Sequence, residues 1–462
     1  MNALIYTSSL GIACLLAEIF NLRRWILPAA VFGLLIIIGL TIQDWDTDQS
    51  AREAALYNML RADGFSLSFS ILLMALTVLL LLLGKTFYAS EAGKISDYVV
   101  LILFILAGGL AMVSFGNVAM LFLGIEVLSV SLYIMAAANK RERRSNEAGM
   151  KYFLMGAFAS GLLLLGIALL YGETGSFDVV EIRDYIASNN ATPLLYAGMA
   201  LILIAMLFKV GAAPFHFWAP DVYDGSPTLH TALMATVAKI AAFAAFYRLF
   251  SACFTPLLNP FGWLFSAVVA LTITVGTLSA LMQESFKRMM AFSGVSNAGF
   301  LMIAIATLYG KTDNAVLYYG FAYGMASITA FAVAMYVFAL SGSEKFDSFN
   351  GLARSHPWLA FAMTIAMLSL AGIPPLAGFF GKYYLFSEAL RNGRMFLVLV
   401  AILNSIVAVY YYLKVVYHMY FFQIPDSGRI NRVPFNYVVV IILTTTATVF
   451  GGLFPSAIIG WW

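Results

Sequence analysis

The stretch that decides the fold is Pro193–Phe250, which reads PLLYAGMALILIAMLFKVGAAPFHFWAPDVYDGSPTLHTALMATVAKIAAFAAFYRLF. Two apolar runs of helical length flank a polar interruption with proline and glycine, and each run carries one lysine, Lys209 and Lys239. A lysine near the middle of a bilayer costs roughly 3 kcal/mol on insertion scales. A helix broken at membrane depth is tolerated only where it is packed in protein or lines a wet cavity. Broken helices with intramembrane charge are typical of transporters, so this stretch predicts a transport path.

The composition of the whole chain is that of a membrane protein. Of its 462 residues, 62% are hydrophobic and 11% are charged, whereas soluble domains carry about 25% charged residues. The net charge of +3 is too small to indicate a nucleic-acid partner. Cys14 and Cys253 are too few for an iron–sulfur cluster, which needs about four thiolates, and no structural disulfide is expected. No glycine-rich phosphate motif follows a strand-like segment, so we expect neither a redox cofactor nor a metal in this chain.

Apolar runs of about 20 residues predict an all-α polytopic membrane protein with about fourteen spans. The expected ranges are 2–20, 25–42, 65–84, 98–114, 117–139, 149–171, 193–212 with a broken continuation to Asp221, 228–250, 262–282, 288–309, 314–340, 357–390 with a Pro–Pro break, 394–421 and 434–456. Met1–Phe20 lacks a basic start and a clear cleavage site, so we interpret it as the first span and not as a signal peptide.

The basic residues of the loops predict the orientation of the chain. With the N-terminus outside, the inside loops hold Arg23, Arg24, Lys85, Lys94, Lys140, Arg141, Arg143, Arg144, Lys287, Arg288, Lys345, Arg354, Arg429 and Arg432. The outside loops hold Arg52, Arg61, Arg183 and Lys311 beside the acids Asp44, Asp46, Asp48, Glu53, Glu173, Asp178 and Glu181. Arg391 and Arg394 fall on the wrong side, but the majority predicts both termini on the outer side.

Two interrupted helices carry a lysine beside their break. Lys209 stands just before the break at Pro214, and Lys382 stands just after the break at Pro374 and Pro375, in IPPLAGFFGK. Interrupted helices in corresponding halves of a transporter mark paired repeats with the ion path at their interface. We therefore expect two repeats and a path that runs between them.

Four charges are expected deep in the membrane. Glu126 lies near the middle of its span, Lys209 ends a helical run, and Lys382 opens the second half of a broken helix. Lys239 lies about 18 Å of helix past Pro227, at mid-depth. A desolvated lysine can be charged or neutral near neutral pH, which is what a proton carrier needs. The alternative, that Glu126 locks one lysine in a static pair, leaves the other lysines unexplained.

The polar residues near the inner ends of the spans allow two interpretations each. Lys151 and Lys414 serve either as interfacial anchors or in transport. His216 and His230 either relay protons from the inside or bind carbonyls freed by the helix break. Asp221 and Asp224 either cap the following helix or, as the less favoured interpretation, collect protons at the mouth of the path.

The motifs resemble a known family. The run FKVGAAPFHFWAPDVYDGSPT, followed by ATVAKIAAF, resembles the proton-conducting module shared by the antiporter-like subunits of complex I and by Mrp-type cation/proton antiporters. EAGMKYFLMGAFASG, LGIEVLSV and GIPPLAGFFGKYYLF resemble the subunit N (subunit 2) branch of NADH-quinone oxidoreductase. The likeness covers nearly the whole chain.

This resemblance implies fourteen helices with two inverted five-helix repeats and two discontinuous helices. The implied division is 1–97 for the N-terminal helices, 98–250 and 251–421 for the two antiporter-like repeats, and 422–462 for the C-terminal helix. It implies Glu126, Lys209, Lys239 and Lys382 as the proton-transfer residues, with Lys151 as a further lysine and His216 in support. The family couples quinone reduction in other subunits, which hold FMN and iron–sulfur clusters, to proton movement through this one.

The resemblance also implies a place in a bacterial plasma membrane, among other membrane subunits of complex I. Lys382 favours this branch over the subunit M type, which usually has glutamate there. The chain stops at Trp461–Trp462, without the long lateral helix of the subunit L type. Asn297 stands where relatives often have histidine, and His230 where they commonly have an apolar residue. An Mrp-type antiporter subunit, a related membrane-bound hydrogenase subunit and a non-transporting scaffold are the alternative functions.

Overall fold

The computed structural model describes residues 2–46, 59–88, 94–189, 192–307, 312–423 and 432–459. Over these ranges the chain is almost entirely helical, and the only β-type pairing is in isolated bridges. Several residues used above for orientation lie outside the described ranges: Asp48, Arg52, Glu53, Lys311 and Arg429. The pair Trp461–Trp462, used above to compare the chain with the subunit L type, also lies outside them.

The expected number of spans is confirmed. Within the described residues, 13 helices are long and apolar enough to cross a membrane, and a broken pair, α17 and α18, supplies one further span. The spanning helices are α1 (Asn2–Ile19), α2 (Arg23–Gln43), α4 (Gly64–Phe87), α5 (Ile95–Ser114), α6 (Val118–Ala136), α7 (Arg143–Thr174), α9 (Pro193–Val210), α11 and α12 (Thr228–Leu233 and Lys239–Ala252, joined by Met234–Ala238), α13 (Leu258–Leu281), α14 (Phe286–Ala306), α15 (Asp313–Ser341), α17 and α18 (Pro357–Ala371 and Ala377–Arg391), α19 (Met395–Phe421) and α20 (Phe435–Leu453).

The short elements between spans are α8 (Val179–Ser188), α10 (Trp218–Gly225), α16 (Leu352–Ser355) and α21 (Pro455–Ile459), with single turns at 44–46, 255–257 and 346–349. The amphipathic α8 lies in a loop where no helix was expected. It begins there because Asp178 accepts hydrogen bonds from the backbone N–H groups of Val180 and Glu181. The narrow division between α5 and α6 is confirmed, with Asn117 capping α6.

The two predicted breaks have the same local structure. α9 ends at Gly211 (φ 71°), and Ala212 donates from its N–H to the Leu207 carbonyl. α17 ends at Gly372 (φ 85°), where Ile373 N–H donates to Leu368 in the same way. Glycine is suited to this left-handed cap because it has no Cβ. A cis X–Pro bond follows each glycine, at Ala213–Pro214 and Pro374–Pro375.

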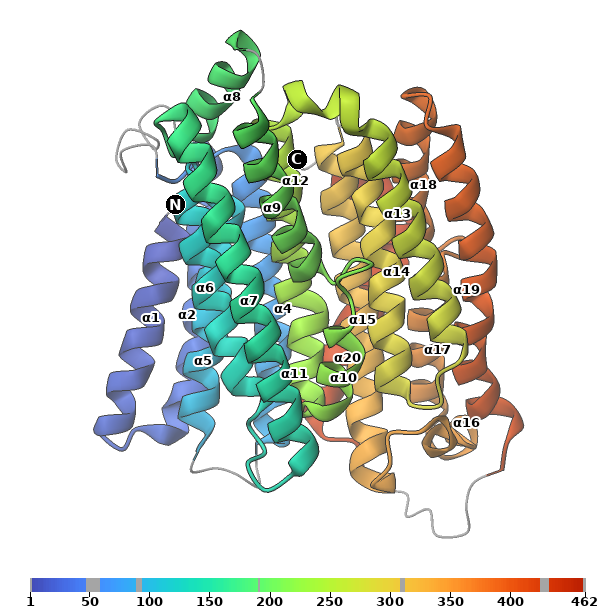
Figure 1. The fold of residues 1–462 in the computed structure, drawn as a ribbon. Helices are drawn as coiled ribbons and strands as arrows, with labels where there is room; N and C mark the ends of the chain where they lie inside the picture. Colours follow the sequence, from blue (N-terminus) through green and yellow to red (C-terminus); the bar gives the residue numbers. More distant parts are fainter. Residues whose placement is uncertain are drawn as a thin grey trace.

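The two broken spans run in opposite directions. In Figure 1, α10 lies toward the lower end of the molecule, whereas α18 lies toward the upper end. Each break therefore opens toward a different face.

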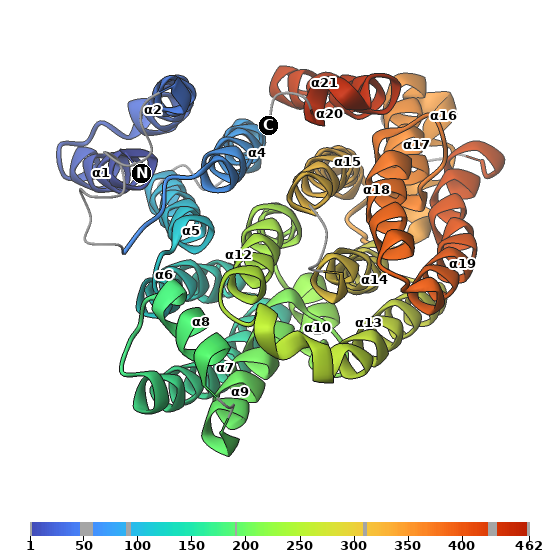
Figure 2. The ribbon, with the colours of Figure 1, turned by 90° about the horizontal axis from the view of Figure 1, so that it is seen from above.

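The centre of the molecule is the span α11–α12 together with α14. All residues in the apolar window of Thr228–Ala252 and 94% of those in the window of Phe286–Ala306 are buried. Figure 2 shows α5–α9 on one side and α13 and α16–α19 on the other, with α12, α14 and α15 between the two groups. Met234–Ala238 forms a π-helical turn directly before Lys239. Such turns interrupt an α-helix and often occur at functional sites.

Both cysteines are free and buried. Their thiols lie on different elements, Cys14 in α1 and Cys253 just after α12.

Candidate functional site

Lys239 lies at the centre of the fold and is 5% exposed. No hydrogen-bond partner for its Nζ occurs among the described residues. Its Nζ lies 5.9 Å from the ring centroid of Tyr223. On the opposite side, a Cβ added to Gly294 of α14 would come within 2.7 Å of this Nζ. The ammonium is thus wedged between an aromatic ring of the first half and a glycine of the second.

Lys209 is hydrogen-bonded to the helix that carries Glu126. Its Nζ donates to Ser129 Oγ at 2.7 Å and, more weakly, to Tyr133 at 3.5 Å. Ser129 lies one turn from Glu126 on α6, while the Glu126 carboxylate accepts a hydrogen bond from Ser160 of α7. Both residues are in the described ranges, and no direct ion pair joins them. The expected pair is therefore open in this structure, with each partner held by a serine.

Glu126→Gln is expected to slow proton-coupled turnover by about tenfold, as a lost interaction of about 1.4 kcal/mol would. The amide keeps an acceptor for Ser160 but loses the negative charge that favours a charged Lys209. Glu126→Asp should retain part of the activity. Proton uptake and electron transfer would be measured on the assembled complex in vesicles. Equal rates for the Gln variant and the wild type would show that Glu126 is only a structural contact.

A cavity of about 20 Å³ separates Lys209 from Lys239. Its walls carry both lysines together with Ser129, Tyr152, Trp218 and Tyr223. A water molecule needs about 10–15 Å³ and two to four polar partners, so the cavity is large and polar enough for one. The two lysines are thereby connected by a space that water can occupy.

Lys382 is the third buried cation, 5% exposed. Its Nζ donates to the carbonyl of Ala371 at 2.9 Å, which is one of the free carbonyls at the end of α17. The same Nζ lies 4.7 Å from the centroid of the Phe300 ring. The helix break thus supplies the acceptor that holds this lysine.

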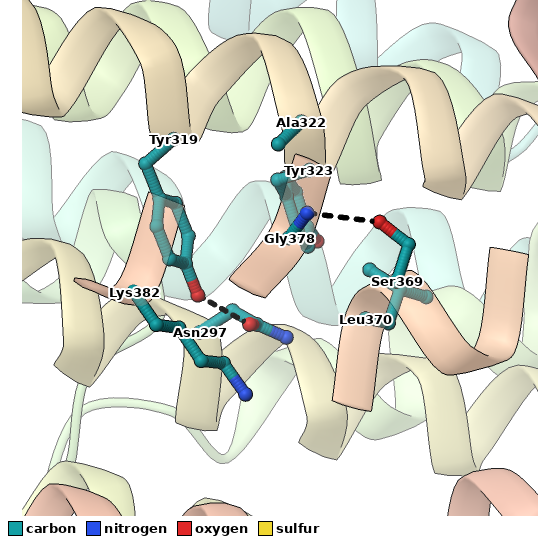
Figure 3. A pocket seen from close by; sticks show the side chains of 8 residues that line it. All are labelled: Asn297, Tyr319, Ala322, Tyr323, Ser369, Leu370, Gly378 and Lys382. Atoms are coloured by element: carbon teal, nitrogen blue, oxygen red, sulfur yellow. Dashed lines mark hydrogen bonds between the residues drawn. The ribbon is translucent and has the colours of Figure 1, made fainter. Parts of the chain in front are cut away.

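A small cavity of about 10 Å³ connects Lys382 to the polar groups of α14 and α15. Figure 3 shows Lys382, Asn297 and Tyr319 together in its wall, with the Tyr319 hydroxyl donating to Asn297 Oδ1 at 2.6 Å. Asn297 Nδ2 donates to the Ser293 carbonyl at 2.8 Å. Asn297 is therefore held between α14 and α15 by its amide.

Tyr323 completes the connection between Lys239 and Lys382. It lines the cavity beside Lys382, and its hydroxyl lies 3.5 Å from the position where Gly294 would carry a Cβ. Lys239 Nζ lies 2.7 Å from the same position. Buried polar groups therefore follow one another from Lys209 to Lys382 through the centre of the molecule.

A polar cavity of about 180 Å³ lies at the lower end of the first half. Lys151 Nζ is 2.8 Å from both Glu147 and Asp221, and Asp221 also accepts from Arg288 at 3.0 Å. These side chains are 36–55% exposed, so the cavity is open to its surroundings. Lys151 is an ion-pair partner here, a contact that its interpretation as an interfacial anchor did not include.

The expected helix caps are wrong. The residue before α11 is Pro227, and no side chain caps that helix. Asp221 instead binds the two cations, and Asp224 accepts a hydrogen bond from Ser285 at 2.8 Å. Both acids face neighbouring helices because α10 turns back against α7 and α14.

The two histidines differ in their surroundings. His230 is fixed between the Met135 carbonyl and the Tyr88 hydroxyl, each 2.7 Å away. It thereby binds a carbonyl at the end of α6, and not one of those freed by the break after α9. His216 is 5% exposed, and its Nδ1 has no hydrogen-bond partner among the described residues. Of these two histidines, His216 is the one with a ring nitrogen that has no partner among the described residues.

Three charged side chains near the ends of the second half have identified partners. Glu388 accepts from Arg391 at 2.8 Å, and Lys414 donates to the carbonyl of Gln283 at 3.0 Å. Lys287, counted above as a loop charge, is 1% exposed and lies 2.7 Å from Glu344. Sequence reasoning missed this buried pair because Lys287 lies in the first turn of α14 and Glu344 in the loop after α15, and only the fold brings them together.

Comparison with known proteins gives a consistent result. Residues 115–408 match the family described as NADH:quinone oxidoreductase/Mrp antiporter, TM. NADH-quinone oxidoreductase subunit N of Flavobacterium psychrophilum is 46% identical over 459 residues, with 99% of each chain covered. Subunit N of Cytophaga hutchinsonii is 40% identical over 461 residues, again with 99% of each chain covered.

Solved structures agree with these relatives. A chain in respiratory complex I from Thermus thermophilus with bound aureothin has a TM-score of 0.83 and 30% identity, over 99% of this chain and 98% of that one. A chain in the Mrp complex from Dietzia sp. DQ12-45-1b has a TM-score of 0.87 at 21% identity, over 99% of this chain and 95% of that one. At that identity the Mrp likeness concerns the fold alone.

Proposed function

Because this chain belongs to the NADH:quinone oxidoreductase/Mrp antiporter transmembrane family, we propose that it is the proton-translocating membrane subunit of a respiratory NADH-quinone oxidoreductase. The observation that carries the proposal is the unbroken series of buried polar groups from Lys209 through Lys239 to Lys382. Lysines buried at membrane depth are costly and mark functional sites by default. Quinone reduction in other subunits would drive protons along this series.

The residues have distinct roles in this proposal. Lys209, Lys239 and Lys382 carry protons in turn, and Glu126 sets the charge state of Lys209. Lys151 and His216 support uptake near the break after α9. The division into repeats 98–250 and 251–421, flanked by 1–97 and 422–462, places one broken span in each repeat.

The proposed setting is a bacterial plasma membrane with both termini on the outer side. The chain would lie between other membrane subunits and hold no redox cofactor, while FMN, iron–sulfur clusters and quinone would belong to partner subunits. Co-purification with flavin and iron–sulfur subunits tests this assignment. Purification without them, in a complex that exchanges cations for protons, would favour the Mrp-type alternative.

The direction of the proposed proton path predicts what replacement of Lys382 does. The break after α9 opens toward the lower face, near Lys151 and Asp221, whereas Lys382 follows the break that opens upward. With the lower face inside, Lys382→Met should block release and reduce pumping by about a hundredfold, within the range for losing a positioned proton-transfer group. Lys239 should still be reached by water from the inside.

Water-access labelling from each side of reconstituted vesicles measures this polarity. In the Lys382→Met complex, label reaching Lys239 from the inside is the expected result. Label that reaches Lys239 only from the outside would show that the proposed direction is wrong.

A further inference from the structure

Tyr223 of α10 has a hydroxyl group that the fold does not use. The residue is 1% exposed, and its Oη is a buried oxygen with no hydrogen-bond partner among the described residues. A buried polar group without a partner typically costs about 1–3 kcal/mol. Packing does not require the oxygen, because a phenylalanine would make the same ring contact with Trp218, whose centroid is 6.4 Å away. The hydroxyl therefore calls for another explanation.

The position of Tyr223 explains why its hydroxyl group is present. The residue lines the cavity of about 20 Å³ that also has Lys209 and Lys239 in its wall. Lys239 Nζ lies 5.9 Å from the Tyr223 ring centroid, and this Nζ is likewise without a partner in the described chain. Two unpartnered buried polar groups thus face one cavity that has room for a water molecule. Lys209, by contrast, is bonded to Ser129 on the far wall.

We propose that the Tyr223 hydroxyl relays protons between Lys209 and Lys239, together with one water molecule in this cavity. The inference rests on the proposed function of the lysines. A proton leaves the Lys209 ammonium and forms a new O–H bond on the water, which passes one of its own protons to Tyr223 Oη. The original phenolic proton moves to neutral Lys239 when a rotation of the flexible lysine side chain brings its Nζ within hydrogen-bond distance of Tyr223 Oη, since the two atoms are not hydrogen-bonded in this structure. Lys209 ends neutral, Lys239 ends charged, and water and phenol end neutral.

Tyr223→Phe tests the relay because it removes only the oxygen. Pumping in the assembled complex should fall by about tenfold or more, since proton-transfer groups contribute about 10²–10⁴-fold. Thermal stability should stay the same or rise. Tyr318→Phe is the matched control: Tyr318 is also 1% exposed, but its hydroxyl donates to the Gly451 carbonyl at 2.7 Å, away from the cavity. This control should keep its pumping and lose some stability.

A second variant blocks the water without touching the phenol. Ala242 lines the same cavity, so Ala242→Val should fill part of it and also lower pumping. The solvent deuterium isotope effect on pumping, measured in all variants, should change in Tyr223→Phe and Ala242→Val but not in Tyr318→Phe. Wild-type pumping in both cavity variants would overturn the relay. If Lys239→Ala still abolished pumping in the same vesicles, the proposed function would survive that result.

Discussion

Replacing Lys239 with alanine is expected to abolish most proton pumping while the complex still assembles. Lys239 is the point where the two halves meet, with Tyr223 on one side and Gly294 on the other. Without its amine the series of buried groups loses the cation that lies between the cavity of the first half and that of the second. We expect a loss of about a hundredfold or more, as for removal of a positioned proton-transfer group.

Assembly should survive because the variant removes a buried ammonium that has no partner in the described chain. Losing an uncompensated charge offsets part of the cost of the cavity left by the side chain. The measurement is proton uptake per NADH oxidised by the complex in vesicles. Lys414→Ala is the control, since Lys414 binds the Gln283 carbonyl outside the series. Wild-type uptake in fully assembled Lys239→Ala complex would refute the role.

Arg248→Met is expected to destabilise the protein by about 3–5 kcal/mol, the usual cost of breaking a buried ion pair. Arg248 is 7% exposed in its side chain and binds Asp63 through two hydrogen bonds of 3.0 and 2.9 Å. It also donates to the carbonyls of Phe115 and Val113, each at 3.2 Å. Methionine would leave the carboxylate and both carbonyls without this donor.

The Arg248–Asp63 pair should also make the stability of the protein depend on pH, through the protonation of Asp63. Burial raises the pKa of Asp63, but the charge and hydrogen bonds of Arg248 outweigh burial and hold it below the usual value. The contribution of the Arg248–Asp63 pair to the stability of the folded protein is therefore complete above the pKa of Asp63 in the unfolded chain, about 3.9. This contribution is lost as the pH falls through the lower pKa that Asp63 has in the folded protein. Wild-type protein should show this acid loss of stability, and Arg248→Met should show less of it.

Thermal unfolding of the purified complex measures the effect. The double variant Arg248→Met/Asp63→Asn should recover part of the loss, because it no longer buries an unpaired carboxylate. Arg391→Ala is the control, because 75% of the Arg391 side chain is accessible and a cation that solvent reaches contributes little to an ion pair. An Arg248→Met protein as stable as the wild type would show that the pair is dispensable.

The sequence alone predicts the membrane spans, the two helix breaks and the buried lysines. Apolar runs of membrane length predict helices because a backbone in lipid must satisfy its hydrogen bonds within the segment. GAAP and GIPP at 211–214 and 372–375 predict breaks because glycine ends a helix and proline cannot continue it. Lys209, Lys239 and Lys382 are conspicuous because charge is rare in such segments. Each of these inferences depends on local sequence.

Tertiary structure decided which groups meet. Ser129 holds Lys209 across 80 positions, and Arg248 reaches Asp63 across 185. Gly294 beside Lys239 has no marker in the sequence, because a glycine in an apolar helix looks the same whether it faces a helix, a lipid or an ammonium. The helix caps assigned to Asp221 and Asp224 were wrong for the same reason. A side chain near a helix start binds whatever the folded chain brings closest. Here α7 brings Lys151 to Asp221, and the start of α14 brings Ser285 to Asp224.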